Sequence, residues 1–157
     1  RLTQGGKEFS ICKFRTMIQD AEKEMGARLA AENDERILPV GKFLRRTRLD
    51  ELPQLWNILK GEMSVVGPRP ERPELAKKIE EEIPEFSYRL KVKAGLTGYA
   101  QIYGKYNTTS YDKLKLDLKY IRNYSLFLDL RLILMTPKIM FMKESTEGIM
   151  EDDAKEI

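Results

Sequence analysis

Apolar residues recur at helical spacing over most of the chain, and glycine and proline separate the periodic stretches. The pattern predicts helices at residues 17–32, 40–47, 49–61, 71–82, 110–124 and 126–143. Short apolar runs predict strands at 9–14 and 96–102, and the prolines and glycine of 64–70 predict a stiff loop. The paired Gly5 and Gly6 predict a turn with positive φ. We therefore expect a compact α+β domain, predominantly helical, with a few short strands and a C-terminal amphipathic helical segment.

The predicted helix 49–61 has a signal at each end. Asp50 is a good N-cap residue, and Gly61 is a typical stop. Ser110 is expected to cap the helix 110–124 in the same way. The apolar positions of the first helix are expected to form its buried stripe, which comprises Leu52, Leu55, Trp56 and Leu59.

The segment 126–143 is strongly apolar, although Asp129, Arg131 and Lys138 interrupt it, and Pro137 is expected to break or kink it. No apolar run approaches the roughly 20 residues that a membrane span needs. Four polar residues fall within a sector of roughly 60° on a helical projection, namely Arg122, Ser125, Asp129 and Thr136. Taken alone, this segment favours a helix buried in the core. The alternative is a helix lying in a membrane interface, with Arg131 and Lys138 reaching toward water.

Length and composition narrow the classes of function. The 157 residues correspond to one domain with a real core. Histidine is absent and Cys12 is the single cysteine, which excludes Ser-His-Asp and Cys-His catalysis, histidine metal sites and an internal disulfide. Residues 144–157 hold six acids and one base, a net charge of −5. Because the whole chain has a net charge of +3, residues 1–143 carry +8. We expect 1–143 to be the functional domain and 144–157 a flexible acidic tail.

Basic residues gather near three apolar segments and suggest phosphate binding, because arginine makes bidentate contacts with phosphate oxygens. Nucleic acid is an alternative partner, but aromatic residues are not interleaved with these bases as stacking would require. The segment around Gly5, Gly6 and Lys7 is not a Walker A loop, and no G-x-G-x-x-G sequence is present. The basic set is Lys13, Arg15, Lys42, Arg45, Arg46, Arg48, Arg69 and Arg72.

The adjacent carboxylates Asp50 and Glu51 are the most informative pair. At a helix start both can face one cleft, where they can hold Mg²⁺ or where one can attack phosphorus. The ordinary interpretation is an acidic N-cap and first turn. On these residues alone, that ordinary interpretation is favoured.

The wider context changes this interpretation. Residues 13–17, 45–64, 66–73, 95–101, 116–121 and 125–130 together closely resemble the bacterial sugar transferase family, the monotopic phosphoglycosyl transferases that begin cell-surface glycan assembly. The resemblance implies transfer of a sugar 1-phosphate from a UDP-sugar to polyprenyl (undecaprenyl) phosphate, with release of UMP and a requirement for Mg²⁺. It implies that Asp50 is the nucleophile, that Glu51, with Asp50, binds the metal, and that Arg69 of the Pro68-Arg69-Pro70 loop binds phosphate.

Further site residues follow from the same resemblance. The other expected phosphate ligands are Lys13, Arg15, Arg48 and Arg72, and the residues expected to bind the donor or shape the fold are Gly95, Thr97, Gly98, Gln101 and Asp117. The chain departs mildly from the family at Ala94 and Tyr99, where proline and tryptophan are frequent.

The family also implies a location. Its members carry a re-entrant membrane helix before the segment that resembles residues 1–5, so we expect a catalytic domain without that helix, from a parent at the cytoplasmic face of the bacterial inner membrane. In that setting we expect residues 126–142 to contact membrane. The rival hypotheses are a non-catalytic peripheral-membrane module with the same fold, and a nucleic-acid-binding domain.

Overall fold

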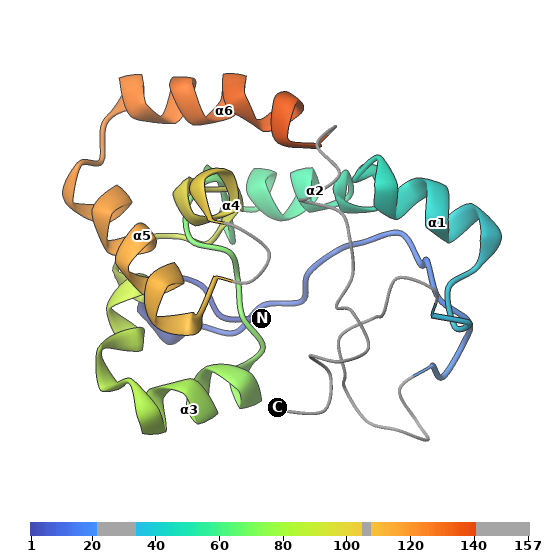
Figure 1. The fold of residues 1–157 in the computed structure, drawn as a ribbon, viewed down its shortest axis with the longest axis horizontal. Helices are drawn as coiled ribbons and strands as arrows, with labels where there is room; N and C mark the ends of the chain where they lie inside the picture. The colour runs from blue at the N-terminus through green and yellow to red at the C-terminus, as the bar shows by residue number, and fades with distance from the viewer. Residues whose placement is uncertain (22–33, 105–107, 141–157) are drawn as a thin grey trace.

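The computed structural model describes residues 1–21, 34–104 and 108–140. Within these ranges helices predominate, and two short strands form a small parallel sheet, which confirms the predicted α+β class (Figure 1). The α-helices are α1 (Pro39–Arg46), α2 (Gln54–Leu59), α3 (Pro73–Glu82), α4 (Tyr99–Tyr103), α5 (Ser110–Arg122) and α6 (Leu126–Met140). The remaining elements are the 3₁₀ turns η1 (Gln4–Gly6), η2 (Leu49–Glu51) and η3 (Pro84–Lys91), and the strands β1 (Ser64–Val66) and β2 (Gly95–Thr97).

The parallel strands fix the loop that carries Arg69. Ser64 pairs with Gly95 and Val66 with Thr97. A Cβ atom on Gly95 would lie 2.1 Å from the Gly67 nitrogen, so only glycine allows the two backbones to approach this closely. The predicted loop 64–70 therefore begins as a strand. The predicted strand 96–102 is correct only up to Thr97, after which the chain turns into α4.

The core consists of two clusters of buried apolar residues. The first surrounds Tyr120 and Leu132, which are almost completely buried, and it is formed by Val66, Ile102, Tyr120 and Leu132. The second packs α3 and η3 against α5 through Ala76, Phe86 and Leu114. Residues from β1, α4, α5 and α6 thus share one core, which ties the C-terminal helix to the strand that precedes the Arg69 loop.

Most predicted helices are present, with corrections at their ends. Thr109, not Ser110, caps α5, because its Oγ1 accepts a hydrogen bond of 3.1 Å from the Asp112 amide. Helix α6 continues through Pro137, which neither ends nor interrupts it before Met140. Residues 141–143 of the predicted segment, and the tail 144–157, lie outside the described residues.

The N-terminal predictions at 9–14 and 17–32 are wrong in the part that can be judged. Residues 9–14 form no strand, and the Asn57 side chain bonds to the backbone of this segment. Its Oδ1 accepts from the Cys12 amide at 2.9 Å, and its Nδ2 donates to the Ser10 carbonyl at 2.9 Å. Residues 17–21 form an isolated bridge from Met17 to Ile37 and then a turn, and residues 22–33 lie outside the described residues. The positive φ of Gly5 and Gly6 is confirmed.

Helix α2 and the turn before it expose the residues that were predicted to be buried. The apolar stripe faces outward, with Trp56 54% exposed and Leu59 78% exposed. Gln54 and Asn57 point inward instead and are almost completely buried. The prediction assumed that water surrounds the helix, and the amphipathic pattern is here inverted. The exposed apolar residues of this region are Val40, Phe43, Leu49, Leu52, Leu55, Trp56 and Leu59.

Helix α6 is buried along one face only, where Leu132 belongs to the first core cluster, so the interpretation as a fully buried core helix is wrong. Two residues of the predicted polar sector also face the protein: Asp129 Oδ1 accepts from the Tyr120 hydroxyl at 2.8 Å, and Thr136 lies 2.8 Å from Thr97, Oγ1 to Oγ1. Arg122 and Ser125, the other two, are exposed. The outer face of α6 exposes Leu126, Phe127, Leu130, Ile133 and Leu134. Among the described residues, no helix is long and apolar enough to cross a membrane.

Candidate active site

The site forms where the chain turns from α1 into η2. Arg48 adopts the left-handed conformation, with φ of 56°, which is uncommon for a residue with a side chain. Asp50 is the middle residue of η2, and α2 begins only at Gln54. The predicted N-cap role of Asp50 is therefore wrong: the 3₁₀ turn and Pro53 separate it from the α-helix. This arrangement leaves the Asp50 carboxylate available for other chemistry.

Glu51 is the centre of a cationic cluster. Its Oε1 lies 2.8 Å from Lys13 Nζ, 2.9 Å from Arg69 Nη2 and 3.9 Å from Arg48 Nη1. Burial alone would raise the pKa of Glu51, but the charges of Arg69 and Lys13 outweigh burial and hold this pKa at about 2. The carboxylate is therefore ionised at neutral pH, and three residues from separate parts of the sequence converge on it.

Asp50 differs from its neighbour. It is also buried, and its Oδ1 has no hydrogen-bond partner among the residues that the structure describes. Burial and the adjacent Glu51 charge raise the pKa of Asp50, against the opposing effect of Lys13, Arg48 and Arg45. Two neighbouring carboxylates with pKa values shifted in opposite directions are typical of a functional site.

Separate backbone contacts place Lys13 and Arg69 beside the carboxylate pair. The Phe14 amide donates to the Asp50 carbonyl at 3.0 Å, which brings Lys13 beside the pair. Arg69 projects from a loop between Pro68 and Pro70, whose fixed φ angles limit its freedom. The loop is tied to the sheet because the Gly95 amide donates to the Pro68 carbonyl at 2.9 Å.

The structure adds Arg45, which the sequence analysis includes only as one of several bases. Its Nη1 is buried and has no hydrogen-bond partner among the described residues. Its charge lowers the pKa of Asp50, so it belongs to the same electrostatic environment. Its spacing of five residues before Asp50 carries no recognisable signal in a sequence with many arginines. Buried unsatisfied donors in a native site point to a group that is not part of the chain.

The other predicted residues lie elsewhere. Arg15 is exposed, and Arg72 is half-buried directly before α3. Gly98 packs against the Gly67 carbonyl, Thr97 bonds to Thr136, and the Gln101 Nε2 donates to the Leu96 carbonyl at 3.0 Å. Together with Gly95, these residues shape the backbone around the Arg69 loop. Their described contacts are with this backbone and with Thr136, and none is with Asp50 or Glu51.

Asp117 is buried on α5, and its Oδ2 lies 2.8 Å from Nη2 of Arg89. Arg89 was not singled out from the sequence, since one arginine in a charged stretch carries no pattern. Burial raises the pKa of Asp117 to about 6, although Arg89 opposes the shift.

This raised pKa predicts a pH-dependent contribution to stability. The native state holds the Asp117 proton more tightly than the unfolded chain, so the contribution is fully present below about pH 4 and is lost as pH rises through about 6. Between pH 4 and 7 we expect the stability of the natural protein, relative to Asp117→Asn, to fall by roughly 2 kcal/mol. Urea unfolding of both proteins across this range measures the difference. A difference that does not vary with pH would contradict the shift.

The residues of the site suit a magnesium ion that is completed by substrate. Mg²⁺ is commonly bound through one or two carboxylates together with substrate phosphates. Asp50 offers a buried oxygen without a partner, and Glu51 is ionised beside it. Within the described parts of the chain there is no cluster of three or more His, Cys, Asp or Glu side chains that could hold a metal without substrate.

Comparison with known proteins now identifies the family. The sequence model described as bacterial sugar transferase matches residues 1–143. The chain belongs to the bacterial sugar transferase family. The match includes every residue of the cationic site, together with helices α2 and α6.

Several curated proteins are similar to this family member. One is the UDP-N-acetylgalactosamine-undecaprenyl-phosphate N-acetylgalactosaminephosphotransferase of Aeromonas hydrophila, 42% identical over 139 residues, which cover 87% of this chain and 33% of that protein. Another is the UDP-glucose:undecaprenyl-phosphate glucose-1-phosphate transferase of Xanthomonas campestris pv. campestris, 42% identical over 137 residues, which cover 84% of this chain and 28% of that protein. The chain thus spans about a third of the length of these curated relatives.

A third relative gives a higher identity over a shorter stretch. The putative undecaprenyl-phosphate N-acetylgalactosaminyl 1-phosphate transferase of Bacillus subtilis is 54% identical over 90 residues, which cover 57% of this chain and 50% of that protein. The relatives differ in the sugar that their names give, while undecaprenyl phosphate is common to all three names.

Proposed function

We propose that this protein transfers a sugar 1-phosphate from a UDP-sugar to undecaprenyl phosphate and releases UMP, as the first membrane step of exopolysaccharide, capsule or O-antigen synthesis. The observation that carries the proposal is the pair Asp50 and Glu51, buried together and surrounded by cations. The named activities of the relatives support the same reaction class.

In the first step, an Asp50 oxygen attacks the phosphorus that carries the sugar. The new O–P bond forms while the bond from that phosphorus to the bridging oxygen breaks, and UMP leaves with that oxygen. Burial makes the carboxylate more basic and hence a better nucleophile than in water. Arg69 and Lys13 are suited to bind the phosphate oxygens as negative charge redistributes.

In the second step, a phosphate oxygen of the lipid attacks the same phosphorus. The Asp50–phosphorus bond breaks and the carboxylate is regenerated. The lipid phosphate is already largely anionic, so the step needs no strong base, which suits a chain without histidine. Glu51 and Asp50 would hold Mg²⁺, which supplies neutralisation of the diphosphate charge when it is bound.

We also propose that the exposed apolar faces of α2 and α6 lie in the membrane interface at the cytoplasmic side. Both helices turn large apolar residues outward, although α6 also buries Leu132 in the core. Lys60 lies 5.6 Å from the centre of the Trp56 ring, Nζ to centroid. An amphipathic surface of this kind with a basic fringe suits anionic lipid. It would bring the lipid acceptor to the site that follows α1.

Membrane binding gives a direct prediction. Replacing Trp56 and Leu59 together by glutamate should reduce binding to anionic liposomes by at least about a hundredfold, because each large apolar side chain contributes about 1.5–3 kcal/mol when buried. Leu75→Glu is the matched control, since Leu75 is 45% exposed on α3, which Figure 1 shows on the opposite side from α6. Co-sedimentation measures the binding. Equal binding by the double variant and the natural protein would contradict the proposed surface.

Arg69 gives a second prediction. Arg69→Ala should fold normally, because 42% of its side chain is exposed, yet lose about a hundredfold in kcat/KM, as expected for removal of a charged phosphate ligand. Arg69→Lys should recover part of the loss, because lysine keeps the charge without the planar fork. Steady-state UMP release measures both variants. An unchanged kcat/KM in folded Arg69→Ala would remove Arg69 from the site.

The reaction itself is tested by a screen for UMP release. The protein is presented in detergent–phospholipid micelles with undecaprenyl phosphate, Mg²⁺ and one UDP-sugar at a time. The proposal expects UMP with at least one sugar, and loss of the signal with Asp50→Asn. Membrane binding without UMP from any UDP-sugar would instead favour the non-catalytic module.

A further inference from the structure

The Arg69 loop has few hydrogen bonds of its own. Pro68 and Pro70 lack amide hydrogens, so the loop presents mainly carbonyl acceptors. The Pro68 carbonyl is satisfied by the Gly95 amide at 2.9 Å, and the Glu71 carbonyl by the Leu2 amide at 3.0 Å. The Arg69 carbonyl between them accepts from a side chain, the Nη2 of Arg89, at 3.0 Å. Among the described residues, this hydrogen bond is the one that holds the Arg69 backbone carbonyl.

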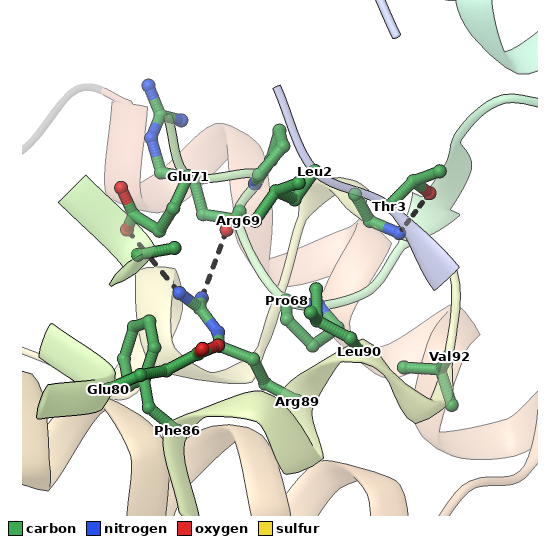
Figure 2. Close-up of a pocket in the computed structure, with 13 residues that line it drawn as sticks. Leu2, Thr3, Pro68, Arg69, Glu71, Glu80, Phe86, Arg89, Leu90 and Val92 are labelled. Carbon is green, nitrogen blue, oxygen red and sulfur yellow. Dashed lines mark hydrogen bonds and ion pairs between the residues drawn. The ribbon is translucent and has the colours of Figure 1, made fainter. Parts of the chain in front are cut away.

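Arg89 is built into the fold behind the loop. It is 5% exposed, and its guanidinium carbon lies 4.7 Å from the centre of the Phe86 ring. Its Nη2 also lies 2.8 Å from Asp117 Oδ2, and its Nη1 lies 3.5 Å from Glu71 Oε1. Figure 2 shows the guanidinium below the loop, with dashed lines to Glu71 and to the Arg69 carbonyl. A buried cation is thus fixed on three sides, by α5, η3 and the loop.

We propose that Arg89, held by Asp117, is a positioning residue that sets the Arg69 backbone so that the Arg69 guanidinium reaches Glu51. The relay runs from the Asp117 carboxylate to the Arg89 guanidinium, then to the Arg69 carbonyl, and ends at the 2.9 Å contact of Arg69 Nη2 with Glu51 Oε1. Arg89 acts behind the loop and touches neither carboxylate of the pair in the described contacts. The role rests on the proposed function of Arg69.

The choice of arginine follows from geometry. One guanidinium can serve two acceptors from a single plane, whereas the lysine ammonium is a compact point charge. A small displacement of a catalytic group is costly, since a misplacement of about 1 Å can reduce rate about a hundredfold. Arg89→Lys keeps the charge beside Asp117 and should therefore fold, while the Arg69 carbonyl loses its donor. Arg89→Gln removes the charge as well.

The test uses arginine-labelled protein and two readouts. In NMR spectra, the Arg69 guanidinium, assigned by its absence in Arg69→Lys, should show the restricted rotation expected of its contact with Glu51, and Arg89→Lys should release it. In UMP-release kinetics, Arg89→Lys should lower kcat/KM by about tenfold to a hundredfold in the natural background. In the Arg69→Ala background the same change should have almost no further effect, because Arg89 acts through Arg69.

Arg36→Gln is the matched control, because Arg36 is similarly buried and paired with Asp34 but lies outside the relay. It should lower thermal stability and leave the Arg69 signal unchanged. An Arg69 signal that does not respond to Arg89→Lys or Arg89→Gln would overturn the inference, as would equal losses in the two backgrounds. A natural protein that releases no UMP with any UDP-sugar would overturn the proposed function alone, since the NMR comparison still decides the position of Arg69.

Discussion

Asp50→Asn is expected to reduce turnover by at least about a thousandfold, which corresponds to about 4 kcal/mol of barrier. Asparagine has the shape of aspartate, but its amide oxygen is not a competent nucleophile toward phosphorus. The variant should fold at least as well as the natural protein, because burial and the neighbouring Glu51 charge already disfavour the ionised form of Asp50. UMP release and thermal unfolding measure the two effects separately.

The neighbouring asparagine Asn57 provides a contrast. It is buried and bonds to the N-terminal segment and to Glu62, so Asn57→Ala should lower stability. Asp50→Asn should show the opposite combination, with stability kept and activity lost. If folded Asp50→Asn retained more than a few per cent of the rate, Asp50 would not be the nucleophile.

Glu51→Gln is expected to lose activity and stability together. Its carboxylate is the shared counter-charge of Lys13, Arg48 and Arg69, so a neutral side chain leaves three cations facing one another. Because those cations are partly exposed, we expect a loss of stability of about 1–3 kcal/mol and not the full penalty of a buried pair. The rate should fall about a hundredfold or more, through displaced phosphate ligands and weaker metal binding.

Magnesium dependence separates the two causes. If Glu51 helps to hold the metal, the Mg²⁺ concentration needed for half-maximal UMP release should rise in Glu51→Gln. Glu81→Gln is the control, because Glu81 is exposed on α3 and has no described contact with Arg89 or with the carboxylate pair. A Glu51→Gln protein with natural Mg²⁺ dependence would assign Glu51 to organising the cations alone.

Much of the fold follows from the sequence because most of its signals are local. The α3 segment begins at a proline and ends before Pro84, and the turn at Gly61 has the positive φ that glycine permits. The apolar period also identified α1, α5 and α6. Propensity predicts a strand at 9–14, but it does not reveal that the backbone of this segment bonds to the Asn57 side chain, which is distant in sequence.

The largest error has a physical cause. An amphipathic pattern predicts that the apolar residues are buried only if the other face of the helix is in water. Trp56 and Leu59 obey the helical period but face outward, while Asn57 faces inward. The pattern gives the period and the two faces, and the solvent decides which face is buried.

Only the part of the site that lies in local sequence motifs could be predicted. Asp50, Glu51 and Arg69 are carried by compact motifs, and the structure brings the carboxylate pair and Arg69 together. Arg45 and Arg89 act through burial and through contacts distant in sequence, which no local pattern records.

The central claim, a covalent intermediate on Asp50, is tested most directly by intact-protein mass spectrometry. The protein is mixed with Mg²⁺ and the UDP-sugar that supports UMP release, without the lipid acceptor. The account predicts an adduct with the mass of the sugar phosphate that maps to Asp50, is absent from Asp50→Asn and disappears when undecaprenyl phosphate is added. UMP that forms only when the lipid is present, with no adduct at any time, would contradict the account and favour direct transfer between the two substrates.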